Sequence, residues 1–270
     1  SPAQVVAEKM KLVSAMSPEG TLIYNADDTI IESQLPEVLQ KRVGYTRYLK
    51  SDFTARRDRV VYADDQPTGI AFTLTDPAGE TFSIAISGTV GLQFVYAAAA
   101  AMAVAAELDV PLDGAAIALK GFVTPRGRMR IMPGIKASFI IDDTYNSSPE
   151  ASKQALLALS EIKYAKRKIA VLGDMLELGN FSGDEHRKIG SQVPAAADML
   201  ITVGVRSRKI AEGAMATGMS EENVLQYEDA DRAGRELQTM LKTGDVVLVK
   251  ASQGLRAERT VEEIMAEPDK

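Results

Sequence analysis

The stretch FIIDDTYNSSPEASKQALLAL, residues 139–159, joins a strand-like apolar run to two aspartates, a tyrosine, an asparagine and a helix that begins at a proline. Three further apolar runs also end in polar or glycine-containing corners: Gly173-Asp174, Gly204, and Lys250 to Ser252. In an open α/β sheet the carboxyl ends of the strands form the crevice that holds ligands. Glycine and aspartate also terminate strands and cap helices, which is explanation enough for one such corner. Four corners together favour a ligand site.

The elements that must position these corners alternate regularly. Strands are expected at ASFIIDDTY, KIAVLGD, DMLITVG, NVLQYED and DVVLVKAS, and amphipathic helices lie near 149–164, 184–195, 206–217, 229–242 and 255–266. Strands that alternate with helices of this length predict parallel βαβ units and a doubly wound α/β sheet. The fully apolar strands fit a sheet that is covered on both faces.

The first half of the chain is less regular. A helix near 3–16 leads to the strand TLIYN, which ends at Ala26-Asp27-Asp28, and segments 58–64, 69–75 and 81–86 resemble an antiparallel set. Helices are expected near 91–108 and 111–121, the second capped by Asp113 or entered through Pro111. Pro133-Gly134 punctuates the chain, and we place a domain boundary there.

Composition excludes several function classes. Of the 270 residues, 46% are apolar and 25% charged, and the net charge is -6, so broad nucleic-acid binding is not expected. The absence of cysteine excludes disulfides and thiolate metal sites and is compatible with a cytoplasmic location. The run VYAAAAAMAVAA is too short for a membrane span, and SPAQVVAEKMKLV does not read as a signal peptide. Because it starts at serine and runs directly into a helix, the chain is expected to be part of a longer polypeptide.

Three segments carry a resemblance to a known family. DDTYNSSPEASKQAL, IAVLGDMLELGNFSGDEH and LVKASQGLRAERTVEEI resemble the C-terminal domain of the Mur ligases, where the first motif usually reads DDxYNANP. The spacing from Lys9 through SPEGTLIYNADD is similar to that of the family's central domain. The resemblance implies an α/β chain whose residues 1–133 are the remainder of a P-loop-type central domain and whose residues 134–270 form a Rossmann-like domain.

The resemblance also implies an activity. Such enzymes use ATP and Mg²⁺ to convert a carboxylate of a UDP-muramoyl peptide into an acyl phosphate, and an amine then displaces the phosphate to form an amide. The motifs look most like the branch that adds D-alanyl-D-alanine to a tripeptide in peptidoglycan precursor synthesis. Members are mostly monomers, so a monomer is expected. Two alternatives stay open: a degenerate binding module without chemistry, and a related ligase with another acid and amine.

On the nucleotide side, the resemblance assigns four residues. Arg128 matches an arginine at the domain junction that contacts ATP, although Arg126 and Arg130 are close alternatives. Asp143 matches the aspartate that holds the ribose, since a carboxylate can accept both hydroxyl hydrogens. Tyr145 and Asn146 complete this side, and Ser148-Pro149 is expected to start the next helix.

On the reacting side, the resemblance assigns five more residues. Lys9 matches a lysine that becomes a carbamate and ligates Mg²⁺, although a solvated helix lysine is the simpler explanation from the sequence itself. Asp174 and His186, the only histidine, match positions near the reacting groups, but a strand-end cap and a packed histidine are the alternatives. Lys250 and Ser252 match a KGS corner that faces the incoming amine, with Ala251 in place of glycine. A plain edge charge is an equally good explanation for the lysine.

Two departures from the family pattern matter. No GxxGKT/S phosphate loop occurs in this sequence, so the chain by itself is not expected to catalyse ligation. A family motif with one histidine and two asparagines is replaced by Gln93, Phe94 and Ala97. Because neither Phe nor Ala can supply the asparagine hydrogen bonds to adenine, either the nucleotide is held differently or activity has been lost.

Overall fold

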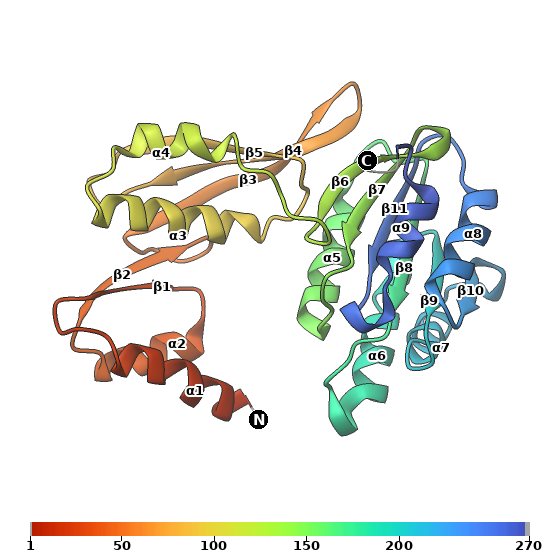
Figure 1. The fold of residues 1–270 in the computed structure, drawn as a ribbon, viewed down its shortest axis with the longest axis horizontal. Coiled ribbons are helices and arrows are strands. Elements are labelled where there is room, and N and C mark those ends of the chain that lie inside the picture. Colours follow the sequence, from red (N-terminus) through yellow and green to blue (C-terminus); the bar gives the residue numbers. More distant parts are fainter. Residues whose placement is uncertain (1, 268–270) are drawn as a thin grey trace. The chain divides into compact units, whose positions relative to one another are not determined.

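The computed structural model describes residues 2–267, and these divide into two compact units, each with its own sheet. The first unit contains residues up to 59, 70–87 and 92–122; the second contains 60–69, 88–91 and the chain from 123 onward. Both are α/β arrangements, as the sequence predicted (Figure 1). None of the described helices is long and apolar enough to cross a membrane.

The first unit has a five-stranded sheet in the order β1-β2-β3-β4-β5. Its elements are α1 (Pro2–Ser14), β1 (Thr21–Asn25), α2 (Thr29–Gln34), β2 (Lys41–Thr46), β3 (Phe53–Ala63), β4 (Gln66–Thr75), β5 (Thr81–Ser87), α3 (Phe94–Glu107) and α4 (Leu112–Leu119). The tip of the β3–β4 hairpin, residues 60–69, is grouped with the second unit. β1, β2 and β3 pair in parallel, while β3, β4 and β5 follow one another through tight turns. The turn between β3 and β4 has positive φ at both Asp64 and Asp65, as a two-residue hairpin turn requires.

Helices α3 and α4 supply the apolar partner of this sheet. Alternate residues of the strands, such as Phe53, Phe72 and Ile84, are buried against Val95 and Met102 of α3. Small alanines let the α3 backbone lie close to the strands. α4 begins after Pro111, whose fixed φ suits a helix entry, and no side-chain cap is formed there.

The second unit has a six-stranded sheet in the order β10-β9-β8-β11-β7-β6. Its elements are β6 (Arg130–Gly134), β7 (Ser138–Asp143), α5 (Pro149–Glu161), β8 (Arg167–Gly173), α6 (Ser182–Gly190), β9 (Met199–Val203), α7 (Arg208–Ala216), β10 (Val224–Tyr227), α8 (Ala230–Met240), β11 (Asp245–Lys250) and α9 (Glu258–Ile264). All neighbouring strands are parallel except β6, which pairs antiparallel with β7. The expected parallel strands and the helices between them are therefore all present.

This topology creates a crevice at the end of β11. The chain steps outward from β8 to β10 and then returns to insert β11 between β8 and β7. α8 and α9 pack in one core cluster with alternate strand residues such as Ile140 and Val247, and α5, α6 and α7 lie on the other face (Figure 1). Because the loops after β11 and its neighbours turn to opposite faces, the carboxyl ends of β7, β11 and β8 lie at a topological switch point.

Candidate functional site

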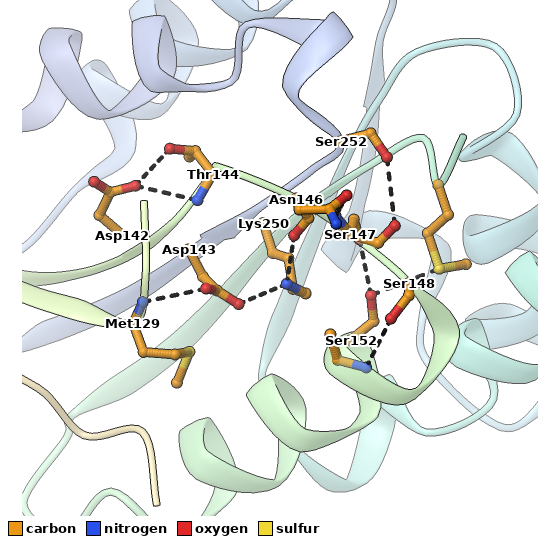
Figure 2. Close-up of polar contacts among 12 residues, drawn as sticks. Met129, Asp142, Asp143, Thr144, Asn146, Ser147, Ser148, Ser152, Lys250 and Ser252 are labelled. Atoms are coloured by element: carbon orange, nitrogen blue, oxygen red, sulfur yellow. Dashed lines mark hydrogen bonds and ion pairs between the residues drawn. The ribbon is translucent and has the colours of Figure 1, made fainter. Parts of the chain in front are cut away.

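The end of β7 carries a buried polar cluster at this switch point (Figure 2). Ile140 and Ile141 are fully buried and anchor β7 in the core. Asp142 and Asp143 are the last two residues of this strand. Asp143 stands in register with Lys250, the last residue of β11. The parallel pairing of two apolar strands therefore places a carboxylate beside an ammonium group.

Asp143 and Lys250 form an ion pair inside the protein. Lys250 Nζ lies 2.6 Å from Asp143 Oδ2 and donates a second hydrogen bond of 2.9 Å to the Asn146 carbonyl. Lys250 is only 2% exposed and Asp143 8%. Burial raises the pKa of the Asp143 carboxyl, while the Lys250 ammonium and the Met129 N–H, which donates to Oδ1 at 3.1 Å, oppose that rise. Both expected site residues are thus brought together, and the Lys250 ammonium is bound by protein groups.

Asp142 is held by a different set of donors. Its Oδ2 accepts the Gly127 N–H at 2.8 Å, and its Oδ1 accepts both the Thr144 N–H at 3.2 Å and the Thr144 hydroxyl at 2.7 Å. Asp142 and Thr144 are both buried. The two consecutive aspartates therefore both bind the segment around Gly127 and Met129.

Arg128 and Tyr145 stack on one another beside the aspartates. The Arg128 guanidinium carbon lies 4.0 Å from the centroid of the Tyr145 ring, and Tyr145 is 49% exposed. The Tyr145 N–H donates to the Gly127 carbonyl at 3.1 Å. A cationic fork on an accessible aromatic face offers both a charge for phosphate oxygens and a surface for a base. Two of the four expected nucleotide residues thus form one unit.

A chain of hydroxyl groups continues the cluster toward β8. The exposed Asn146 uses its side-chain oxygen to accept the Ser147 N–H, and Ser147 Oγ lies 3.0 Å from Ser152 Oγ. Ser252 Oγ accepts the Leu176 N–H at 2.9 Å and approaches the Ser147 carbonyl at 3.4 Å (Figure 2). Ser148 caps α5 through the Ala151 N–H, as expected from the Ser-Pro pair.

A cavity of about 230 Å³ opens next to this cluster within the second unit. Its wall combines the polar strand-end residues Asp142 and Thr144, the ring of Tyr145 and apolar residues such as Met132 and Val261 of α9. The wall also includes the charged residues Arg126, Glu258 and Glu262, so the cavity combines apolar surface with several polar groups, as small-molecule sites do.

Asp174 lies at the end of β8, and its carboxylate binds residues of the turn between β9 and α7. Its Oδ1 accepts the Ser207 N–H at 2.7 Å before α7, and Oδ2 lies 3.6 Å from Arg206. Gly204 has a φ of +104°, and a Cβ there would come within 2.6 Å of Asp174 Oδ1. The aspartate therefore fixes the β9–α7 turn.

His186 is fully buried in α6 with both ring nitrogens engaged. Nε2 accepts the Met175 N–H at 2.9 Å, and Nδ1 lies 2.6 Å from the Ser182 carbonyl. This arrangement assigns the ring proton to Nδ1 and ties α6 to the loop after β8. No sequence signal identified Met175 as the partner.

The remaining predicted residues lie in the first unit. Lys9 is an exposed residue of α1. Gln93 and Ala97 are exposed at the start of α3, and Phe94 packs against Phe122 with ring centroids 5.9 Å apart. Among residues 2–267, no three acidic or histidine side chains gather in a way that could hold a metal ion.

A second polar cluster surrounds Asp27 after β1. Its carboxylate accepts the Thr46 hydroxyl at 2.5 Å, the Arg47 N–H at 2.7 Å and the Tyr96 hydroxyl at 3.0 Å. Burial acts to raise the pKa of Asp27, but these hydrogen bonds outweigh it and lower the pKa below its ordinary value. The sequence marked Asp27 only as a strand end, because its partners are about 20 and 70 residues away.

The chain is similar to known proteins over most of its length. The family model described as Mur ligase, glutamate ligase domain, matches residues 127–253. The chain is 27% identical over 267 residues to the UDP-N-acetylmuramoyl-tripeptide–D-alanyl-D-alanine ligase of Bacillus subtilis, and 27% identical over 266 residues to that of Escherichia coli. These matches take up 98% and 96% of the chain and 55% of each relative. The chain thus spans about half the length of the curated relatives it matches.

Solved structures support the fold. A MurF ligase from Thermotoga maritima in complex with ADP superposes with a TM-score of 0.81 at 22% identity, over 97% of this chain and 57% of that one. A MurF from Acinetobacter baumannii gives a TM-score of 0.80 at 22% identity, over 99% and 56%. At this level of identity the likeness speaks for the fold alone.

Proposed function

Because this chain belongs to the Mur ligase family, we propose that its second unit forms the C-terminal half of the ATP site of an enzyme that makes an amide bond on a peptidoglycan precursor. The acid substrate we propose is a UDP-muramoyl tripeptide and the amine is D-alanyl-D-alanine. The relatives that carry this name in Bacillus subtilis and Escherichia coli support the choice.

The observation that carries the proposal is the Arg128–Tyr145 stack at the switch point of the sheet. Its guanidinium is exposed and its ring half-exposed, so both can reach a ligand. Arg128 would bind phosphate oxygens, and Asp143 would accept a ribose hydroxyl with the lone pairs that Lys250 and Met129 leave free. Asn146, exposed beside them, would complete the nucleotide side.

The reaction we propose has two steps. A carboxylate oxygen of the tripeptide attacks the γ-phosphorus of ATP, and the bond to the β-phosphate oxygen breaks to release ADP. The dipeptide amine then attacks the acyl carbon, and phosphate leaves as the amide forms. Residues such as Arg128 contribute by placing the nucleotide and stabilising negative charge.

The two units of this chain would contribute differently to the reaction. We propose that the first unit is the remainder of the central domain and that the C-terminal domain, expected from 134, already includes 123–133 with β6. Ligation would depend on a phosphate loop that this sequence does not contain. Lys9 is exposed, and the described residues do not by themselves form a magnesium site. Lys250 and His186, being buried and bound by protein groups, would support the site rather than touch substrate.

A second candidate function is a Mur-like binding module without catalysis. It is favoured by Gln93, Phe94 and Ala97, which stand where the family pattern has a histidine and two asparagines. Phe94 packs on Phe122, so its ring is already in contact with a neighbour. This module would still bind a nucleotide through Arg128 and Tyr145.

A chimera separates the two functions. The matched segment of this chain, 98% of its length, replaces the corresponding segment of the Bacillus subtilis relative, so that a phosphate loop is supplied. The purified chimera is incubated with ATP, Mg²⁺, UDP-muramoyl tripeptide and D-alanyl-D-alanine, and the pentapeptide is measured by mass spectrometry. The unaltered relative is the positive control, and the Lys9→Ala and Asp143→Ala chimeras are the negative ones.

Pentapeptide that is lost in both variants supports the ligase. A folded chimera that binds ATP but forms neither product nor phosphate, with any amine offered, supports the binding module. For either function we propose a monomer in the cytoplasm, with small-molecule ligands and no nucleic-acid partner.

A further inference from the structure

The segment that carries Arg128 is held at two points, one on each side of this residue. The Gly127 N–H donates to Asp142 Oδ2 at 2.8 Å, and the Met129 N–H donates to Asp143 Oδ1 at 3.1 Å. These two hydrogen bonds fix the backbone on both sides of residue 128. The Arg128 side chain is exposed and lies over Tyr145.

Asp142 holds both halves of the stack, whereas Asp143 holds one. Asp142 Oδ1 accepts the N–H and the hydroxyl of Thr144, the residue directly before Tyr145. A single buried carboxylate therefore ties the Arg128 segment to the Tyr145 segment. The Tyr145 N–H closes the link by donating to the Gly127 carbonyl at 3.1 Å.

Backbone geometry at Gly127 shows how closely the two segments approach. Its φ of +71° lies in the left-handed region, and a Cβ at this position would come within 2.7 Å of the Tyr145 nitrogen. The link between the segments thus has no room for a side chain, and Asp142 supplies the acceptors for the N–H groups that face it.

We propose that Asp142 is the positioning residue of the nucleotide half-site: it holds Arg128 stacked on Tyr145 before a ligand binds, and touches no ligand itself. The role rests on the proposed function. A preformed guanidinium–ring pair loses less conformational entropy on binding than two free side chains, so affinity depends on the carboxylate that fixes it.

The test uses the 270-residue chain and two NMR readouts. In Asp142→Asn an amide N–H₂ replaces one acceptor oxygen and leaves either the Gly127 N–H or the Thr144 donors without a partner. We expect faster amide exchange at Gly127 and loss of the ring-current shift on the Arg128 side-chain protons. ADP affinity, measured by titration, should fall about tenfold to a hundredfold, as expected for losing hydrogen bonds to a charged acceptor.

Asp229→Asn is the matched control. Asp229 likewise uses its carboxylate to accept a backbone N–H, that of Arg232 at 2.7 Å, but at the start of α8. This variant should leave the Arg128 shift and the ADP affinity unchanged. Thr144→Val, which removes only the hydroxyl donor, should reduce the Arg128 shift partially and decides the matter if Asp142→Asn does not fold.

An unchanged Arg128 ring-current shift in the folded Asp142→Asn or Thr144→Val protein overturns the proposal. A wild-type chain that shows the stack but binds no ADP refutes the nucleotide function, while the link from Asp142 to the stack is still read from the Arg128 shift. The two failures are therefore distinguishable.

Discussion

Removing the ammonium of Lys250 should destabilise the second unit far more than removing a surface lysine. Lys250→Met keeps most of the side-chain volume but leaves the Asp143 carboxylate, 8% exposed, with the Met129 N–H as its hydrogen-bond donor. The reverse change, Asp143→Asn, leaves the buried ammonium with the Asn146 carbonyl. Each single change therefore creates a buried charge without its counter-charge.

The expected cost follows from burial rather than from distance. Breaking a buried ion pair by removing one partner typically costs about 3–5 kcal/mol, whereas an exposed pair is worth about 0–1 kcal/mol. Lys188 and Glu185 provide the matched control, because their atoms are also 2.6 Å apart but the Lys188 side chain is 67% exposed. We expect Lys188→Met to leave the free energy of unfolding nearly unchanged, because water screens this exposed pair.

Hydrogen exchange of the β11 amides measures this free energy within the second unit. The double variant Lys250→Met/Asp143→Asn should cost less than the sum of the single changes, since it removes both charges. Costs below about 1 kcal/mol for both single variants, or strict additivity, would refute the account of a buried coupled pair.

The loss of stability in Lys250→Met should depend on pH. Burial raises the pKa of Asp143, so the native state keeps this proton to higher pH than the unfolded chain does. The stability that this group contributes is present at low pH and is lost as the pH rises through the native pKa. Without Lys250 the carboxyl loses its opposing charge, so the penalty of Lys250→Met should shrink on acidification. A penalty that grows instead contradicts the assignment.

Three other predictions concern single residues. The hydrogen bonds that lower the pKa of Asp27 contribute stability above the ordinary carboxyl pKa of about 3.9, which is lost as the pH falls through the lower native pKa. Asp27→Asn should therefore flatten the acid limb in urea titrations at several pH values, and an unchanged limb contradicts this. Gly127→Ala should cost at least about 1 kcal/mol and lower the melting temperature, because its φ is positive; a neutral effect argues against the close approach to Tyr145. His186→Phe orphans the Met175 N–H and should cost about 1–3 kcal/mol in urea denaturation without changing the ADP affinity of the folded protein; a lower affinity would instead place His186 in the site.

The architecture of the second half could be predicted because its strands are continuous apolar runs separated by helix-length segments. Strands β2 and β6 were not predicted, each for its own reason. β2 has the sequence KRVGYT, which contains two basic residues and a glycine, and β6, RIMPG, is an edge strand that contains a proline. Neither shows a pattern that single-sequence reasoning recognises as a strand.

The strand end that carries the candidate site could be predicted from the sequence, but most of its internal contacts could not. The motif around Asp143 marked the strand end, yet the partner Lys250 is 107 residues away and meets it only because β11 inserts beside β7. Periodicity does not encode strand order. The role of Asp142 was likewise hidden, because its partner Gly127 belongs to a loop whose path depends on β6 pairing with β7.

An ATP titration of the isotope-labelled chain, followed by NMR, tests whether the second unit binds a nucleotide at the end of β7. We expect saturable shifts centred on Arg128, Asp143 and Tyr145, and their loss in Arg128→Ala while the rest of the spectrum stays that of a folded protein. Shifts centred elsewhere, or no shifts at millimolar ATP, would contradict the nucleotide half-site.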